Sequence, residues 1–382
     1  MKILLLTNEF APYRGGIATY VVNLALAAYE LGQTITVVAP DYGGTHGEKD
    51  SRTFPFRVIR YAGGINRPWQ QPGKAMLVSR LLKKEHYDVV HAADWPFYIP
   101  IALAARHYPR ICTLHGSEIL SMSKQPKRGA LTLSRAFNGD VRWVANSRFT
   151  ANLFSTHFPT VDLKKVSSEL LGVGKEWFCH REARDEARRR FSIPLDGIHI
   201  ITIARLTRRK GHLNLFKAFH LLPEVYRQKI SYTIIGSGMD SGYVEEITSE
   251  MSNSSIPVQI LSGLGDEDVR DICAASDLFC LPGALSKEDV VEGFGLALLE
   301  AAALGVPAIA GSVGGVAEVV DDGVSGLVVP VDDVSALANA VRYLVENPRE
   351  LDRLGRGARS RAETLTWHRC AQATYQLGVA GS

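Results

Sequence analysis

Long hydrophobic runs are missing from this chain of 382 residues: no apolar stretch approaches the 18 residues that suggest a membrane-spanning helix. The apolar run at the N-terminus has only four residues, too few for the core of a signal peptide. Cysteine is scarce, and the five cysteines form no C-x-x-C pair, which argues against a disulfide framework or a structural zinc site. We therefore expect a cytoplasmic protein, with any membrane contact peripheral and on the inner face of the plasma membrane.

A strong excess of one charge is also absent. The chain has 43 Lys and Arg against 40 Asp and Glu, a net charge of +3, so nucleic acid is not the expected partner. The total conceals an asymmetry, because residues 1–170 have a net charge of +9 and the remaining residues −6. The basic half predicts an anionic partner, and a solvated charged face is the alternative.

The chain is 46% hydrophobic and 22% charged, a globular composition, and its length suits two domains better than one. Short apolar runs alternate with amphipathic segments, and this rhythm restarts after residue 195. Strands without a polar face that alternate with helices predict parallel sheets covered on both sides, hence two Rossmann-like α/β domains. The expected strands are Ile3–Leu6, Ile35–Val38, Val89–His91, Ile111–Leu114, Trp143–Ala145, Ile198–Ala204, Tyr232–Ile235, Val258–Leu261, Leu278–Leu281 and Ala308–Ala310. The expected helices are Ala18–Leu31, Met76–Glu85, Tyr98–His107, Leu213–Leu222, Asp268–Ser276, Gly295–Ala303 and Val334–Glu346.

The linker between the two domains is expected around Leu171–Lys175 and a charged helix at Arg181–Arg190, whose arginines we interpret as solvated. This places the first domain at residues 1–172 and the second at 173–364. Open α/β sheets bind ligands beyond the carboxyl ends of their strands, so we expect a site in a cleft between the domains.

Two features follow strands of the first half. The first strand leads through NEFAPYRGG into a helix, where Gly15 and Gly16 would let the backbone approach an anion. A tight turn is the alternative, and the absence of G-x-G-x-x-G leaves a nicotinamide cofactor without support. Asp94, in HAADWP with His91, is expected at the same sheet edge. There it either accepts a hydrogen bond from an acceptor hydroxyl or forms a turn.

His115 ends another expected strand and is followed by glycine. A histidine in this position can hydrogen-bond a substrate hydroxyl or support an oxyanion, and a structural role is the alternative.

In the second half, cations between Arg205 and Lys210 separate a buried strand from a helix. Such cations suit a diphosphate, and a basic surface turn is the alternative. Gly236 and Gly238 follow the next strand and would allow close approach of a nucleotide.

The most informative stretch is EGFGLALLE, residues 292–300. Its two glutamates, with glycines between them and ahead of a helix, put Glu292 at the helix entrance and Glu300 two turns along on nearly the same side. One carboxylate can then reach a sugar and the other a ribose, while the N–H groups at the helix start take phosphate charge. A chance glutamate pair on a helix is the alternative.

Asp266-Glu267-Asp268 matches the D-x-D pattern of some metal-dependent transferases, but its setting is typical of a helix start. We therefore predict no protein-bound metal and no cofactor. The segment Lys74–Lys84, KAMLVSRLLKK, predicts an amphipathic helix that could lie on a membrane surface or bury its apolar face in the core.

Together these motifs resemble glycosyltransferase family 4, the retaining transferases with the GT-B fold. The resemblance extends over nearly the whole chain, through NEFAPYRGGIATYVVNLALAAYELG, HGSE, VANSRFT, ARLTRRKG, IIGSG and EGFGLALLEAAALGVPAIAGSVGGVAEVVDDGVSGLVVP. The final TWHRCAQATYQL is similar to the family's last helix, which implies that residues of about 365–379 return to the first domain.

The resemblance implies that Arg205 and Lys210 bind the donor diphosphate, Glu292 the donor sugar and Glu300 the ribose. It places His115 near the reacting face of the sugar and Gly16 under the diphosphate. The backbone donors it implies at the helix start are Phe294, Gly295 and Leu296. It further implies a metal-independent mechanism in which the leaving diphosphate deprotonates the acceptor.

The stretch Leu281–Val291, with Glu288 and Asp289, resembles the mannosyl phosphatidylinositol and exopolysaccharide mannosyltransferase branches. This implies GDP-mannose as the donor, with a UDP-sugar left open. The expected acceptor is an anionic or lipid-linked saccharide or glycolipid. Two alternatives stay open: an epimerase of sugar nucleotides with a GT-B-like fold, and a non-catalytic subunit that binds a nucleotide sugar.

Overall fold

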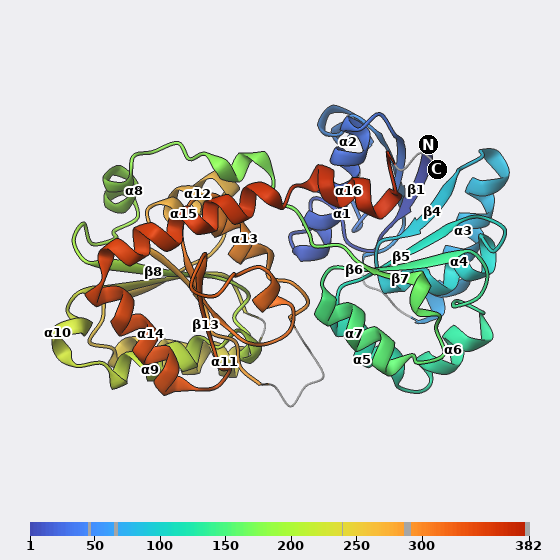
Figure 1. Cartoon of the computed structure of the whole chain (residues 1–382). Helices are drawn as coiled ribbons and strands as arrows, with labels where there is room; N and C mark the ends of the chain where they lie inside the picture. The colour runs from blue at the N-terminus through green and yellow to red at the C-terminus, as the bar shows by residue number, and fades with distance from the viewer. Residues whose placement is uncertain (45–46, 65–67, 239, 286–291, 379–382) are drawn as a thin grey trace. The chain divides into compact units, whose positions relative to one another are not determined.

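The computed structural model describes residues 1–44, 47–64, 68–238, 240–285 and 292–378. Within these ranges the chain forms two compact units: unit 1 contains Met1–Gly172 and the segment from Trp367 onward, and unit 2 contains Val173–Thr366. Each unit has one sheet in which all neighbouring strands are parallel, with seven described strands in unit 1 and six in unit 2 (Figure 1). The predicted α/β class with two Rossmann-like sheets is confirmed.

The sheet of unit 1 has the strand order β3-β2-β1-β4-β5-β6-β7. β1 is flanked by β2 and β4, so Leu6 lies opposite Val38 on one side and Ala92 on the other. The chain order reverses between β1 and β4, and the carboxyl ends of these two strands therefore border the point where open α/β sheets bind ligands. The strands are β1 (Lys2–Leu6), β2 (Thr34–Pro40), β3 (Arg57–Tyr61), β4 (Val89–Ala92), β5 (Arg110–Leu114), β6 (Val141–Ala145) and β7 (Val166–Ser168).

Helices cover the sheet of unit 1, with α1 beside α16 and α3 beside α4. Trp143 of β6 is fully buried and stacks on Phe154, while Tyr98 meets its ring edge-on. The helices are α1 (Gly16–Glu30), α2 (Gly47–Thr53), α3 (Gln71–Lys84), α4 (Tyr98–Ala104), α5 (Ser117–Ser123), α6 (Lys127–Leu133), α7 (Arg148–His157) and α16 (Trp367–Tyr375).

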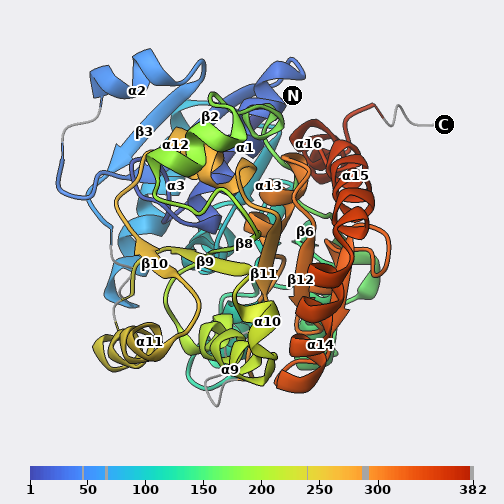
Figure 2. The ribbon, with the colours of Figure 1, turned by 90° about the vertical axis from the view of Figure 1, so that its left-hand side faces the viewer.

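The sheet of unit 2 has the order β10-β9-β8-β11-β12-β13, and Figure 2 shows β10 to β12 side by side in this order. Its strands are β8 (Ile198–Ile203), β9 (Ile230–Ile235), β10 (Val258–Leu261), β11 (Leu278–Leu281), β12 (Ala308–Gly311) and β13 (Gly326–Val329). Its helices are α8 (Arg184–Arg190), α9 (His212–Leu221), α10 (Glu224–Arg227), α11 (Ser241–Asn253), α12 (Asp266–Ala274), α13 (Leu296–Ala303), α14 (Val334–Glu346) and α15 (Pro348–Thr364).

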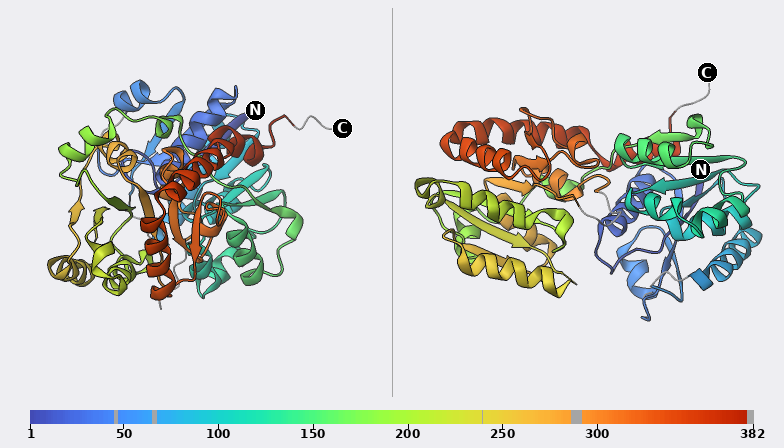
Figure 3. Two further views of the ribbon diagram at one scale, coloured as in Figure 1. Left: turned by 60° about the vertical axis from the view of Figure 1, so that its left-hand side comes forward. Right: turned by 90° about the horizontal axis from the view of Figure 1, so that it is seen from below.

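Two helical layers enclose the sheet of unit 2. Helices α9, α11 and α14 lie on one face, and α8, α12, α13 and α15 on the other (Figure 1). The red C-terminal segment can be followed in Figure 3 from α14 and α15, which belong to unit 2, into α16, which belongs to unit 1.

Three helices differ from the sequence expectation by more than two residues at one end, and one of them, expected at Met76–Glu85, begins already at Gln71. The helix expected at Tyr98–His107 ends at Ala104 because Tyr108 precedes Pro109, a position that disfavours helical backbone, and Tyr108 instead closes a turn onto Ala105.

The charged helix expected at Arg181–Arg190 begins at Arg184, and its arginines are not simply solvated. The side chain of Arg188 is 1% exposed and donates to Asp277 and to the carbonyls of Ala275, Pro194 and Leu195. The correction has a physical reason: each of the three guanidinium nitrogens of Arg188 has an acceptor within the unit, so the helix can bury this side chain against it.

Candidate active site

A cluster of two cations and one carboxylate lies beyond β8 in unit 2. Arg209 and Lys210 both donate to the same oxygen of Glu292, at 2.5 and 2.6 Å, and each of the three side chains is at most 20% exposed. One turn of 3-10 helix, Arg208–Lys210, turns these cations toward Glu292, while Arg208 pairs with Glu246. The sequence alone does not single out Arg209, although Arg209 lies within the run of cations that predicts the diphosphate site.

The charges of this cluster are coupled. Burial lowers the pKa of Lys210, against the opposing effect of the Glu292 charge. Burial also acts to raise the pKa of Glu292, but the charges and hydrogen bonds of Lys210 and Arg209 outweigh it and leave that pKa lowered. Glu292 is therefore an anion that holds two cations at a common point, and a diphosphate could take over those cations.

The backbone around Glu292 is fixed by a glycine turn. The carbonyl of Glu292 accepts a hydrogen bond from the N–H of Gly315 at 2.9 Å. Gly314 has a φ of 65°, and a Cβ there would lie 2.0 Å from the same carbonyl oxygen. Only glycine fits this position.

Arg205 lies two residues beyond the end of β8 and is exposed. Its side chain makes no hydrogen bond or ion pair with any described residue, but its charge contributes to the lowered pKa of Lys210. It is thus a nearby cation that is not bound to Glu292.

The two glutamates of the EGFGLALLE stretch occupy different settings. Glu292 lies in the loop before α13 and not at its entrance, because Gly295 adopts a left-handed φ of 98° and α13 begins only at Leu296. Glu300 lies within α13, where burial together with the charges of Glu176 and Asp266 raises its pKa to about 8. The predicted two-turn spacing on one helix is wrong, and Glu300 is mostly neutral at pH 7 whereas Glu292 is charged.

Other predicted groups at the start of α13 are placed as follows. Phe294 is buried, Gly295 precedes the first helical residue, and Leu296 is partly buried. Gly295 caps the helix without a side-chain hydrogen bond, so the N–H groups of its first turn are not taken by a capping side chain.

The acidic D-x-D sequence is the first turn of α12. Asp268 pairs with Arg181 at 2.9 Å and with Arg190 at 2.6 Å, and Glu267 pairs with Arg181 at 2.7 Å. Within the described ranges, no group of three or more His, Cys, Asp or Glu side chains is arranged to hold a metal ion.

Close packing within unit 2 accounts for the glycines at positions 236 and 238. A Cβ on Gly236 would lie 1.9 Å from the carbonyl oxygen of Ala204, and one on Gly238 would lie 2.9 Å from the Cβ of Leu206. The close approach that we expected for a nucleotide is therefore made first by the chain's own backbone at the ends of β8 and β9.

In unit 1, Gly15 and Gly16 lead into α1. Gly16 is its first residue and is exposed, and neither a side-chain cap nor an acidic residue occupies the first turn. This helix start can therefore accept an anion.

His115 directly follows β5. Its Nε2 lies 2.7 Å from the carbonyl oxygen of Ala93, and its ring meets that of Tyr20 edge-on at 5.1 Å. A carbonyl oxygen only accepts, so the proton sits on Nε2, and the Nδ1 of the neutral ring remains an acceptor.

Asp94 is buried beyond the end of β4. One of its oxygens accepts hydrogen bonds from the N–H of Asn8 at 2.6 Å and from the hydroxyl of Thr7 at 3.0 Å. The other, Oδ1, has no partner among the described residues. Lys74 Nζ donates to the Oδ1 of Asn8 at 2.9 Å. Asn8 therefore contacts both the carboxyl of Asp94 and the ammonium of Lys74, next to the point where the strand order reverses. Burial raises the pKa of Asp94 to about 7 and lowers that of Lys74 to about 8.

His91 was expected to face the sheet edge with Asp94, and it does not. Its ring is fully buried and bonded on both nitrogens, to Tyr375 of α16 and Thr113 of β5. The alternation of side chains along β4 puts it under the helix instead.

The amphipathic segment 74–84 corresponds to α3. Val78 and Lys74 are buried, and Leu77, Leu81 and Leu82 pack against the core of unit 1. The apolar face is used inside the unit, so membrane contact through this face is not supported. In the described part of the chain, no helix combines the length and apolarity that crossing a membrane requires. Glu288 and Asp289, which suggested a mannosyl donor, lie outside the described residues.

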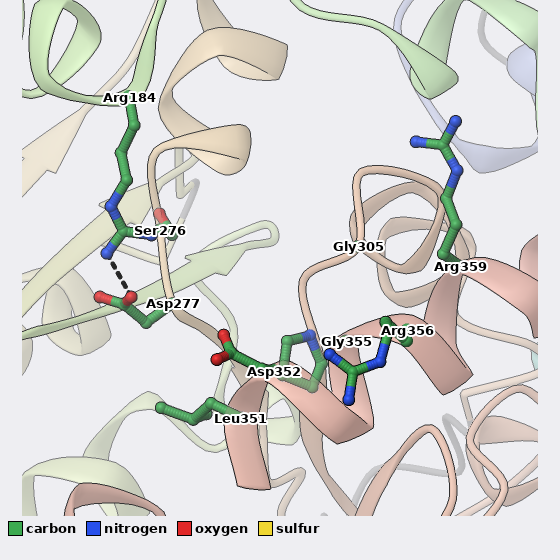
Figure 4. Close-up of a pocket in the computed structure, with 10 residues that line it drawn as sticks. Arg184, Ser276, Asp277, Gly305, Leu351, Asp352, Gly355, Arg356 and Arg359 are labelled. Atoms are coloured by element: carbon green, nitrogen blue, oxygen red, sulfur yellow. Dashed lines mark hydrogen bonds and ion pairs between the residues drawn. The ribbon is translucent and has the colours of Figure 1, made fainter. Parts of the chain in front are cut away.

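Unit 2 also has an open depression of about 430 Å³. It lies at the amino ends of β11 and β12 and along α15, where Figure 4 shows Arg184 reaching Asp277. None of the predicted site residues lines it, and it borders the opposite sheet edge from Glu292. Arg359 in the wall of this depression donates to the carbonyl of Ala303, so one of its N–H donors is already occupied.

Comparisons with known proteins agree with this geometry. Residues 14–167 match the family described as Glycosyltransferase Family 4, and residues 183–361 match Glycosyl transferases group 1. A GDP-mannose-dependent alpha-(1-6)-phosphatidylinositol monomannoside mannosyltransferase of Mycolicibacterium smegmatis is 32% identical, over 92% of this chain and 91% of the relative. A GDP-mannose-dependent monoacylated alpha-(1-6)-phosphatidylinositol monomannoside mannosyltransferase of Corynebacterium glutamicum is 28% identical, over 95% and 93%.

Among solved structures, Anabaena HepE in complex with UDP has a TM-score of 0.79 at 19% identity, over 98% of this chain and 99% of that chain. WaaG, a glycosyltransferase involved in lipopolysaccharide biosynthesis, has a TM-score of 0.74 at 16% identity, over 99% and 100%. The chain therefore belongs to glycosyltransferase family 4 and is a glycosyltransferase with the GT-B fold.

Proposed function

We propose that this enzyme is a retaining, metal-independent mannosyltransferase that uses GDP-mannose. Its proposed acceptor is a hydroxyl of a lipid-linked or phosphatidylinositol-type glycoside. The observation that supports this most is the cluster of Arg209, Lys210 and Glu292, because buried cations held at one point suit a leaving diphosphate. The donor and acceptor follow the named activities of the mycolicibacterial and corynebacterial relatives.

In this mechanism Arg205, Arg209 and Lys210 stabilise the charge that develops on the diphosphate as the glycosidic bond breaks. Glu292 orients the two buried cations and contacts the sugar. A diphosphate oxygen takes the proton of the acceptor hydroxyl on the same face of the sugar, which retains the configuration. No protein nucleophile is required.

The other roles divide between the units. Glu300, mostly neutral at pH 7, can both donate a hydrogen bond to a ribose hydroxyl and accept one. The N–H groups at the starts of α1 and α13 take phosphate charge, and Nδ1 of His115 accepts a hydrogen bond from a sugar hydroxyl. The basic unit 1 receives the acceptor, with Asp94 on the acceptor side, and any membrane contact is peripheral and electrostatic.

The test is a thermal-shift panel of GDP, UDP, ADP and TDP with their sugars, followed by transfer assays in EDTA. Saturating GDP-mannose should stabilise the protein more than the other donors, since a ligand at 100 times its dissociation constant adds about 2.7 kcal/mol. NMR of the product should show an α-linkage. Sugar isomerisation without an acceptor would favour the epimerase alternative, and binding without turnover would favour the non-catalytic one.

A further inference from the structure

Four polar side chains from four elements of unit 1 form one buried hydrogen-bond chain. Tyr375 of α16 lies 3.0 Å from Nδ1 of His91, whose Nε2 lies 2.7 Å from the hydroxyl of Thr113. The same hydroxyl lies 2.8 Å from that of Tyr20 on α1. None of the four residues is more than 3% exposed, so water does not compete for these bonds.

This hydrogen-bond chain ends at Tyr20, whose ring contacts the ring of His115. The ring of Tyr20 meets the His115 ring edge-on, with centroids 5.1 Å apart and an interplanar angle of 77°. On another side Tyr20 packs against Trp367, the first residue of α16. The hydroxyl of Tyr20 is held by Thr113, so the chain determines where the aromatic edge that supports His115 can lie.

The protons of the chain make it act as a unit. Burial first, then the charge of Arg142, lowers the pKa of His91 to about 3, so its ring is neutral and must donate at one nitrogen and accept at the other. The direction of the bond between Tyr375 and His91 therefore fixes the direction of the bond between His91 and Thr113. If His91 accepts from Tyr375 it donates to Thr113, and if it donates to Tyr375 it accepts from Thr113. Removing a hydroxyl at one end leaves a buried polar atom without its partner and rearranges the chain toward the other end.

The helix that supplies Tyr375 is itself anchored in unit 1. Arg142 of β6 donates to the carbonyl of Thr374, and Arg369 of α16 donates to the carbonyl of Leu170. An element that only covered apolar surface would need no hydroxyl aimed at His91, whereas α16 places one there.

We infer that α16 orients His115 from a distance through Tyr375, His91, Thr113 and Tyr20, which are positioning residues for the transfer reaction. The catalytic relevance of this orientation rests on the proposed role of His115, but the orientation itself does not. The C-terminal segment is then part of the machinery of unit 1, although more than 250 residues separate Tyr375 from His115 in the sequence.

The kinetic test compares Tyr20→Phe, Tyr375→Phe and the double variant in the full-length enzyme. Each single variant should lower kcat about tenfold and leave KM for the donor within about twofold, a coupling in the usual range. The kcat of the double variant should be no lower than that of the less active single variant, because both substitutions break the same hydrogen-bond chain.

Tyr87→Phe and Tyr232→Phe are matched controls. Each removes a buried tyrosine's hydrogen bond, to Glu85 at 2.7 Å and to Thr202 at 2.9 Å, outside the His115 chain. They should leave kcat within about twofold. Additive losses in the double variant, or equal losses of kcat in the controls, would mean that the hydroxyls serve stability alone and would overturn the inference.

A second readout does not need activity. The ring 15N and 1H signals of His115, assigned with His115→Gln, should move in Tyr20→Phe and Tyr375→Phe and stay in place in both controls. Signals that move in an enzyme without detectable transfer support the chain and reject the proposed function. Signals that stay fixed in Tyr375→Phe reject the chain, whatever the activity.

Discussion

Lys210 donates to Oε2 of Glu292 at 2.6 Å, an oxygen that it shares with Arg209. One carboxylate thus holds two cations that would otherwise repel each other in a largely buried place. This sharing makes the two partners unequal: loss of Lys210 leaves the ion pair between Arg209 and Glu292, whereas loss of Glu292 leaves two cations facing each other. The same carboxylate also marks the place of the diphosphate charge in the proposed reaction.

We predict that Lys210→Ala and Glu292→Ala each lower transfer at least 100-fold, because both remove stabilisation of the leaving group. Their stabilities should differ. Lys210→Ala should change the free energy of unfolding little, while Glu292→Ala should lower it by about 3–5 kcal/mol, the usual cost of leaving a buried charge without its partner. Added GDP should restore much of the lost Tm of Glu292→Ala, since its phosphates replace the missing negative charge. Transfer rates and thermal unfolding with and without GDP measure all three effects.

Arg208→Ala is the control for this cluster. Arg208 belongs to the same short helical turn but pairs with the exposed Glu246. It should keep normal transfer and normal Tm. Equal loss of activity in this variant would mean that general positive charge, and not the Glu292 cluster, serves the donor.

Gly236→Ala tests whether this glycine serves the fold or the ligand. A Cβ at Gly236 would lie 1.9 Å from the carbonyl oxygen of Ala204, so the ends of β8 and β9 would have to separate. We expect a loss of about 2–4 kcal/mol in the free energy of unfolding, measured by urea titration. Gly73→Ala in α3, where no atom lies within 4 Å of the added Cβ, should be neutral or gain up to about 1 kcal/mol. A fully stable Gly236→Ala that loses only nucleotide affinity would return this residue to donor binding.

How far the sequence predicts this molecule depends on the range of the interactions involved. Central strands such as Ile3–Leu6 can be predicted from the sequence because each is a continuous apolar run between helices. The edge strand β7 has only the residues Val166–Ser168 and no such run, and it is defined by pairing with Trp143 to Ala145 of β6. Local pattern cannot supply a partner that is more than 20 residues away.

The same limit applies to the site. The run of Arg208, Arg209 and Lys210 indicates a basic turn, but the direction of each side chain depends on Glu246 and Glu292, which other elements supply. The EGFGLALLE stretch predicts two useful carboxylates. Their opposite protonation states follow from their surroundings and not from spacing: burial, with a contribution from Glu176, raises the pKa of Glu300, whereas Lys210 and Arg209 outweigh burial at Glu292.

Metal dependence is the third prediction. Asp268 is held by Arg181 and Arg190, so its carboxylate is already neutralised by two guanidinium groups. We expect that EDTA leaves the transfer rate unchanged and that Asp268→Asn keeps full activity, with a decrease in Tm of roughly 2 °C or less, as for exposed ion pairs. Strong inhibition by EDTA that manganese reverses would contradict the metal-independent mechanism.

The last prediction concerns the buried acid at the switch point of unit 1. Burial, with a contribution from the charge of Glu9, raises the pKa of Asp94 to about 7, from about 3.8 in the unfolded chain. The folded state therefore favours the neutral acid: this contribution to stability is complete below pH 3.8 and is lost as the pH rises to about 7. Asp94→Asn keeps an oxygen for Thr7 and Asn8 but cannot ionise. The free energy of unfolding of Asp94→Asn relative to the wild type should accordingly increase by at most about 4 kcal/mol between pH 4 and pH 7 and stay level above pH 7, and the difference in Tm should follow the same profile. Lys74→Met is a control for the direction of the effect. Loss of the ammonium should raise the pKa of Asp94 further and move the pH range of the stability change to higher pH. A difference in Tm that is independent of pH in this range would show that Asp94 is ionised throughout.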